Sequence, residues 1–155
     1  MCRHMGVRRE LIEVTRVDNA SEKVLTAINR LVPQLSGSAR PLDLEDLKRL
    51  VGTDCVNFLL AMDGDTGEIL GTLTLVVFPI PTGIRAWIED VIVDSNARGK
   101  GVGKLLTKRA IEIAGSAGAK TVDLTSRPSR VEANSLYQGL GFELRETNVY
   151  RFVGN

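Results

Sequence analysis

The stretch 87–106, WIEDVIVDSNARGKGVGKLL, constrains the fold more than any other part of the chain. Its first half is rich in β-branched apolar residues, which favour a strand. Asp94, Ser95 and Asn96 then supply turn formers. From Val102 onward, apolar residues recur at spacings of three and four, which is typical of one helix face. The stretch is therefore predicted to form a strand, a short turn and a helix.

A glycine-rich, basic segment lies between this predicted strand and the predicted helix. It consists of Arg98, Gly99, Lys100, Gly101, Val102, Gly103 and Lys104. The first turn of a helix presents unpaired N–H groups, and the helix dipole adds partial positive charge there. Glycines let the backbone approach an anion closely, and the cations add charge. We interpret the segment as a cradle for phosphate or pyrophosphate. The alternative is an ordinary turn with solvated basic side chains.

Neither common nucleotide-binding pattern fits this segment. A P-loop has a glycine five residues before its Gly-Lys-Ser/Thr, but Arg98 precedes Gly103 by five and Leu105 follows Lys104. The dinucleotide pattern G-x-G-x-x-G also fails, because its last glycine would fall on Lys104 or Leu106. Neither nucleotide-binding motif is therefore present.

Two sequence blocks carry a resemblance to a known family. Arg98, Gly101 and Gly103 match the pattern Arg-x-x-Gly-x-Gly, and the segment 134–142, NSLYQGLGF, matches N-x-x-Y-x-x-x-G-F. With the strand before the first block and the amphipathic helix after it, they resemble the GNAT (general control non-repressible-related) N-acetyltransferase superfamily. The likeness covers residues 87–142, and the first third of the chain carries none.

The remaining residues read as further strands and helices of one domain, residues 1–155. Strands are predicted at 11–17, 56–62, 68–78, 85–93, 121–125 (buried), 142–145 and 149–152. Helices are predicted from Asn19 to near Pro33, over 43–51, from Val102 to about Gly115, and from a capping box at Ser129-x-x-Glu132 to a stop at Gly141. Residues 1–9 are basic, and we expect them to be frayed.

This order of elements is typical of an α+β fold with a mixed sheet. The resemblance implies the three-layer α/β/α GNAT acyl-CoA N-acyltransferase fold, whose mixed, mostly antiparallel sheet has splayed central strands. Here those strands are 85–93 and 121–125. In that fold the pantetheine arm of acetyl-CoA lies in the notch, bonding main-chain groups of Val91, Ile92 and Val93. The cradle at 98–104 binds the pyrophosphate.

Amide formation from a thioester requires a neutral amine, a polarised carbonyl and a proton for the departing thiolate. The resemblance places Tyr137 as the acid. Alternatively, Tyr137 is a core aromatic, because it shares a helix face with Ala133, Leu136 and Leu140. Asn134 is predicted to bind a water or the cofactor, and its alternative is a solvated helix position.

Glu89 and Asp90 are the candidate bases. Adjacent strand residues point to opposite faces, so both acids face the acceptor only if the strand contains a bulge. We favour Glu89, which could deprotonate the ammonium through a water or hold it as an ion pair; either acid could instead be an edge residue in water. Trp87 falls on the side of Glu89 and could wall the acceptor pocket. Arg127, like Arg130, could bind an anionic group of the acceptor, reach the phosphates of CoA, or be an ordinary surface charge.

Composition limits the other function classes. The net charge of +1 gives no general attraction to nucleic acid or membrane. Cys2 and Cys55 form no disulfide framework, and with His4 as the sole histidine no metal site is expected. No apolar run approaches a membrane span and no signal-peptide core is evident, so the expected location is cytoplasmic. No cysteine lies in the motif region, which favours direct transfer over an acyl-enzyme.

We therefore expect an acyl-CoA-dependent N-acyltransferase that moves acetyl from acetyl-CoA to a primary amine of a small molecule or peptide in a ternary complex. The alternative from another class is a catalytically silent acyl-CoA-binding sensor. Nucleic-acid binding is a more distant alternative, because the chain has no basic stripe with interleaved aromatics. The first block also resembles glucosamine-phosphate N-acetyltransferases, but that local likeness leaves the acceptor open. Homodimers are common in the superfamily, and the sequence leaves the oligomeric state and acyl preference open.

Overall fold

The computed structural model describes residues 11–154. The expected frayed start, with Cys2 and His4, lies outside the described residues. The chain divides into two compact units, the first ending at Thr125 and the second beginning at Ser126. The structure defines the arrangement inside each unit, and the single domain over 1–155 stays a prediction.

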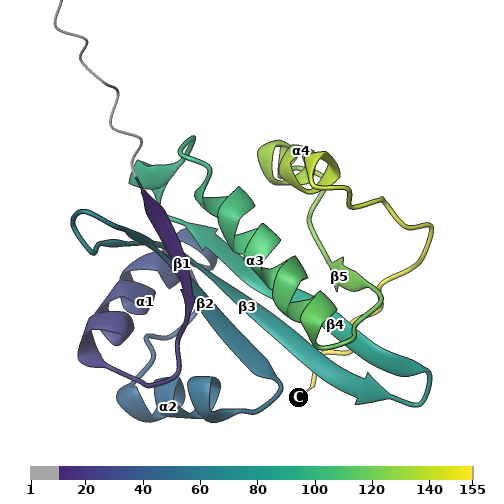
Figure 1. Ribbon diagram of the computed structural model, residues 1–155, viewed down its shortest axis with the longest axis horizontal. Coiled ribbons are helices and arrows are strands. Elements are labelled where there is room, and N and C mark those ends of the chain that lie inside the picture. Colours follow the sequence, from purple (N-terminus) through teal and green to yellow (C-terminus); the bar gives the residue numbers. More distant parts are fainter. Residues whose placement is uncertain (1–10, 155) are drawn as a thin grey trace, which may run out of the picture. The chain divides into compact units, whose positions relative to one another are not determined.

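Within residues 11–125 the first unit contains one five-stranded sheet in the order β1-β2-β3-β4-β5 (Figure 1). The strands are β1 (Ile12–Arg16), β2 (Val56–Asp63), β3 (Ile69–Ile80), β4 (Gly83–Val93) and β5 (Val122–Leu124). The first four pair antiparallel, and β5 runs parallel to β4. The mixed, mostly antiparallel sheet is thus confirmed. However, β5 is a half-buried edge strand and not the buried strand expected, because its outer side has no strand partner among these residues.

Three helices of the first unit are α1 (Glu22–Leu35), α2 (Leu44–Gly52) and α3 (Val102–Ser116). α1 ends at Leu35, two residues past the expected end near Pro33. Proline removes a single N–H donor, and here it does so only in the last turn, where Ser36 N still donates to Val32 O at 2.9 Å. Within residues 11–154 no helix is long and apolar enough to cross a membrane.

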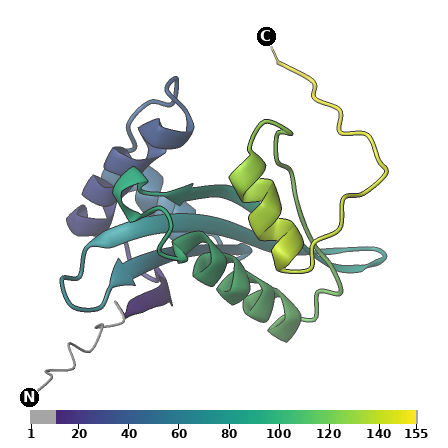
Figure 2. The same cartoon turned by 90° about the horizontal axis from the view of Figure 1, so that it is seen from above.

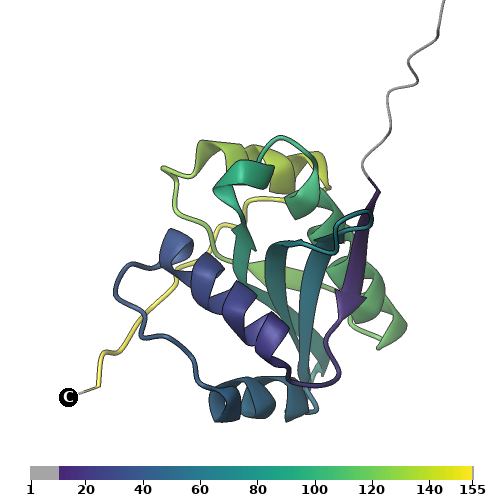
Figure 3. The same cartoon turned by 90° about the vertical axis from the view of Figure 1, so that its left-hand side faces the viewer.

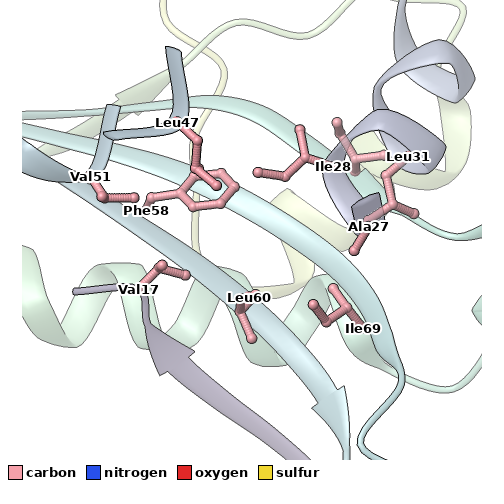
Figure 4. Packing of buried hydrophobic residues seen from close by; sticks show 10 residues of the cluster. Val17, Ala27, Ile28, Leu31, Leu47, Val51, Phe58, Leu60 and Ile69 are labelled. Atoms are coloured by element: carbon pink, nitrogen blue, oxygen red, sulfur yellow. The ribbon is translucent and has the colours of Figure 1, made fainter. Parts of the chain in front are cut away.

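The two faces of the sheet carry different helices, with α1 and α2 on one side and α3 on the other (Figures 2 and 3). Phe58 and Leu60 of β2 pack into the α1/α2 side (Figure 4). This apolar cluster consists of Val17, Ala27, Ile28, Leu31, Leu47, Val51, Phe58, Leu60, Ile69 and Ile92. The alternate residues Leu59 and Ala61 are fully buried on the opposite side, under α3. The first unit therefore has the three layers that the resemblance implied.

The start of α3 lies directly on the sheet at Gly71 of β3. A Cβ at this position would lie 2.6 Å from the carbonyl oxygen of Ile92, 3.0 Å from Val102 Cγ1 and 3.3 Å from Leu106 Cδ1. Only glycine permits this approach. Gly71 thus sets how closely the start of α3 approaches β3.

The second unit, described to Gly154, contains α4 (Val131–Gly139). Gly141 adopts a φ of +91° and donates to Gln138 O, while Phe142 N donates to Tyr137 O, both at 3.0 Å. This is a Schellman stop, so the predicted end at Gly141 is confirmed. The predicted capping box is wrong: the helix begins after Arg130, which places Glu132 too early in the first turn.

The two strands predicted at 142–145 and 149–152 are also wrong. Residues 140–154 form no strand, and Leu144, Val149, Tyr150 and Phe152 are exposed. A strand requires a neighbour to satisfy its N–H and C=O groups, and the observed sheet, which ends at β5, pairs with none of these residues. Their apolar alternation alone does not supply that neighbour.

Candidate functional site

The pairing of β5 with β4 ends about halfway along β4. Their pairing is limited to Ala86 with Val122, Trp87 with Asp123 and Ile88 with Leu124. Beyond Ile88, the edge of β4 that faces away from β3 has no strand partner among residues 11–125. The segment 91–93 lies on this part of β4, and an edge without a strand partner is the arrangement to which an extended ligand can add.

A bulge interrupts β4 at the two candidate acids. Thr72 pairs with Ile92 but Thr74 pairs with Glu89, so Asp90 and Val91 together oppose a single β3 residue. Asp90 has a φ of +47°, the positive value that such a kink imposes. As a result, Glu89 and Asp90 are both exposed although they are adjacent. The bulge that the sequence argument required is present.

Trp87 and Glu89 lie on the same face of β4, as predicted. The indole Nε1 of Trp87 donates to Glu89 Oε1 at 2.6 Å. Glu89 pairs with Thr74, which in turn pairs with Phe58, so this face is the α1/α2 side of the sheet. The indole N–H fixes one carboxylate oxygen and leaves the other facing solvent.

The glycine-rich turn is the segment between β4 and α3, residues 94–101. It contains a short 3₁₀ helix, Ser95–Ala97, followed by two glycines with left-handed backbone. Gly99 and Gly101 have φ values of +79° and +82°, which favour glycine whatever the surrounding space. Gly101 is the N-cap of α3, and no side chain caps the helix. Its first N–H groups are therefore open to an external anion.

Cations surround this uncapped helix start. Arg98, Lys100 and Lys104 are exposed. Lys100 also acts on the β2–β3 turn: the N–H groups of Thr66 and Asp65 lower the pKa of Asp63, and the charge of Lys100 adds to that lowering. The segment thus combines open donors with positive charge, as a diphosphate requires.

In the second unit, α4 buries Tyr137 and places its ring 5.8 Å from that of Phe142 in an edge-to-face contact. Burial raises the pKa of Tyr137 above its ordinary 10.0, and the charge of Arg130 opposes this only in part. The phenol is therefore protonated at neutral pH. Asn134 Nδ2 donates to Arg127 O at 3.0 Å, which joins two predicted site residues and gives Asn134 a role in shaping its own unit.

A hollow in the first unit is lined by none of the predicted site residues. That hollow, of about 400 Å³, lies between the β3–β4 turn and the α3–β5 connection, at the end of β4 away from the glycine-rich turn. Arg85 and Lys120 are among its lining residues, and Arg85 pairs with Asp123 at 3.3 Å.

Three residues at the site were missed by the sequence argument. Arg30 and Gln34 of α1 bond Asp94 and the N–H of Ser95, at the very start of the glycine-rich turn. From sequence, Asp94 is only a turn former. Gln34 lies beyond the expected helix end near Pro33, so no pattern in the sequence pointed to it or to Arg30.

Residues 26–142 match the Acetyltransferase (GNAT) family. The chain belongs to this family. It is accordingly an acyl-CoA-dependent acetyltransferase, in a family that uses acetyl-CoA and an amine acceptor.

Individual relatives differ in how much of their length is matched. A glucosamine 6-phosphate N-acetyltransferase of Trypanosoma brucei brucei is 36% identical over 117 residues, which cover 74% of this chain and 75% of that protein. A mycothiol acetyltransferase of Renibacterium salmoninarum is 34% identical over 108 residues, 68% of this chain but only 32% of the relative. The chain thus spans about a third of that relative's length. The crystal structure of a Trypanosoma brucei acetyltransferase superposes with a TM-score of 0.76 at 27% identity, covering 92% of this chain and all of that chain.

Proposed function

We propose that this GNAT acetyltransferase transfers acetyl from acetyl-CoA directly to a primary amine of a small molecule or peptide. The observation that carries the proposal is the combination at one end of β4: an open strand edge leads into an uncapped helix start behind two left-handed glycines. An extended amide-bearing arm fits the former, and a diphosphate fits the latter.

Acetyl-CoA would be held by both parts of this arrangement. Val91, Ile92 and Val93 would offer main-chain groups to the pantetheine arm, and the segment 98–104 would bind the diphosphate. Acetyl-CoA supplies the acyl group, activated as a thioester. The fit rests on the φ values of Gly99 and Gly101 and on the absence of a side-chain cap on α3.

Glu89 is proposed as the base that makes the amine nucleophilic. Its carboxylate is exposed and is held by the indole of Trp87, so the other oxygen can accept a proton from the ammonium, directly or through a water. Trp87 would also wall the acceptor pocket on the same face. Asp90, turned outward by the bulge, is the second candidate for this role.

Tyr137 is proposed as the acid that protonates the departing thiolate. Its burial keeps the phenol protonated, which is the form that an acid requires. The contact with Phe142 shows that the ring also packs within its own unit. Asn134 and Arg127 are proposed to contact the cofactor and an anionic acceptor group, respectively.

The test measures free thiol released from acetyl-CoA with a panel of acceptors, alongside calorimetric binding of acetyl-CoA. The panel contains amino sugars, amino acids, polyamines, aminoglycosides and peptides with free N-termini. Glucosamine 6-phosphate comes first, because it is the acceptor in the name of the trypanosomal relative.

Thiol release with one class of amine would support the proposal and define the acceptor. Binding without release across the panel would favour the alternative, a silent acyl-CoA sensor. An absence of acetyl-CoA binding would overturn the assignment of the segment 98–104. The variant Arg98→Glu tests the contribution of this segment to acetyl-CoA binding. Lys108→Glu is its charge-matched control, because Lys108 is an exposed cation farther along α3.

A further inference from the structure

Asp94 organises the start of the glycine-rich turn. Its side chain is buried, and Oδ1 accepts from Asn96 N at 3.0 Å. Its main chain is fixed as well: Asp94 N donates to Leu70 O, and Asp94 O accepts from Ala97 N, both at 2.8 Å. The direction in which the chain leaves β4 therefore depends on this residue.

Two side chains of α1 hold this point from outside the turn. Arg30 bonds Asp94 Oδ2 through Nη1 and donates to Ile69 O through Nη2 at 2.7 Å. One helical turn later, Gln34 Oε1 accepts from Ser95 N at 2.9 Å. The contacts with Asp94 and Ser95 join residues 64 and 61 positions apart in the sequence. α1 thus fixes two consecutive residues of the turn.

The charge of Arg30 has a second consequence. A buried carboxylate in a loop that binds a diphosphate would repel it, and an unpaired buried charge is itself costly. Arg30 neutralises Asp94 and keeps its geometry. In the residues that follow, Gly99 and Gly101 adopt left-handed backbone and no side chain caps α3, so no side-chain cap fixes the start of the helix.

We propose that Arg30 and Gln34 are positioning residues for the acyl-CoA phosphate site. They hold Asp94 and Ser95 so that the turn and the start of α3 are already shaped for the diphosphate before acetyl-CoA arrives. This inference rests on the proposed function of the segment 98–104. The two residues act only through the turn, so they affect the affinity for CoA and not the chemical step.

The experiment measures CoA binding by calorimetry, with thermal unfolding as a check that each variant is folded at the assay temperature. In Arg30→Met the Kd for CoA should rise about tenfold or more, since it loses a charge-assisted bond and leaves Asp94 unneutralised. In Gln34→Met it should rise about three- to tenfold, as expected for one neutral hydrogen bond. Arg30→Lys should recover part of the loss because it keeps the charge. Arg49→Met, which alters an exposed arginine of α2, is the control and should bind CoA as the parent does.

The double variant Arg30→Met with Asp94→Asn separates charge from packing. It should bind CoA more tightly than Arg30→Met alone, because the unneutralised carboxylate is gone. Once an acceptor is known, the KM for acetyl-CoA should rise in Arg30→Met while kcat at saturation stays near the parent value. Should Arg30→Met fail to fold, Gln34→Met still decides the matter.

Unchanged CoA affinity in folded Arg30→Met and Gln34→Met would overturn the positioning role. A kcat loss with unchanged affinity would do the same. If the parent protein itself binds no CoA, the proposed phosphate site fails first, and that outcome is distinguishable because it needs no variant.

Discussion

Replacing Gly71 with alanine should both destabilise the protein and weaken acetyl-CoA binding. The added Cβ would lie 2.6 Å from Ile92 O, where ordinary contact begins at 3.4 Å, so one of them must move by about 0.8 Å. Val102 and Leu106, at 3.0 and 3.3 Å, restrict movement on the other side. The site is thus closed by a strand backbone and by the first turns of α3.

The size of the effect follows from two opposing terms. Overpacking a close-packed interior costs about 1–3 kcal/mol. Against this, alanine reduces the entropy of the unfolded chain and returns about 0.4–1 kcal/mol. The overpacking term is the larger here because a backbone carbonyl, and not a flexible side chain, is the nearest atom. A net loss of about 1–2 kcal/mol corresponds to a fall in Tm of about 2–8 °C for a chain of this size.

Thermal and denaturant unfolding measure this loss, and Gly115→Ala is the matched control. Gly115 lies in α3, and a Cβ there would meet nothing within 4 Å. Alanine at that helical position should raise stability by about 0.5–1 kcal/mol. The Kd for CoA should also rise in Gly71→Ala, because the displaced atoms belong to β4 and the start of α3. A Gly71→Ala protein as stable as the parent would refute the argument from close approach.

Four further predictions concern the proposed site and the burial of Tyr137. Arg98→Glu should raise the Kd for CoA roughly 10- to 100-fold by losing a charged contact with the diphosphate, whereas Lys108→Glu should not; equal affinities in calorimetry would remove Arg98 from the site. Glu89→Gln should lower kcat about 100-fold or more and change the pH–rate profile, and an unchanged profile would leave Glu89 as a positioning group. Tyr137→Phe should lower turnover at intact CoA affinity, and normal turnover would leave Tyr137 a core aromatic. Because burial raises the pKa of Tyr137, its phenol ionises at lower pH in the unfolded chain than in the folded protein. The free energy of unfolding should therefore fall as the pH rises above about 10. Denaturant unfolding measures this fall, and the contribution of Tyr137 to it should be absent in the Tyr137→Phe variant.

The local elements around the glycine-rich turn were predictable from sequence. The strand, turn and helix over 87–106 depend on short-range properties, namely β-branching, turn formers and apolar periodicity. Gly141 as a helix stop was predictable for the same reason, since a left-handed residue at that place favours glycine. The need for a bulge between Glu89 and Asp90 followed from strand alternation alone.

Predictions failed where the outcome depends on a partner distant in sequence or on a shift of one or two residues. The strands expected at 142–145 and 149–152 have the right pattern but pair with no strand of the observed sheet. α1 passes through Pro33 because only its last turn loses a hydrogen bond. The capping box at Ser129 failed because the helix starts after Arg130. A residue pattern describes what a segment can form, and its neighbours decide whether it does.

By itself the sequence determined the order of the central elements, the position of the glycine-rich basic segment proposed to bind phosphate, and the family to which the chain belongs. These depend on residue types at short, fixed spacings. Only the tertiary structure decided that β4 leaves β5 after Ile88, that the indole of Trp87 orients Glu89, and that Arg30 and Gln34 hold the start of the turn. The physical reason is clearest for the two contacts of α1. Arg30 with Asp94 and Gln34 with Ser95 are more than 60 positions apart, and hydrogen bonds at that separation have no local sequence signature.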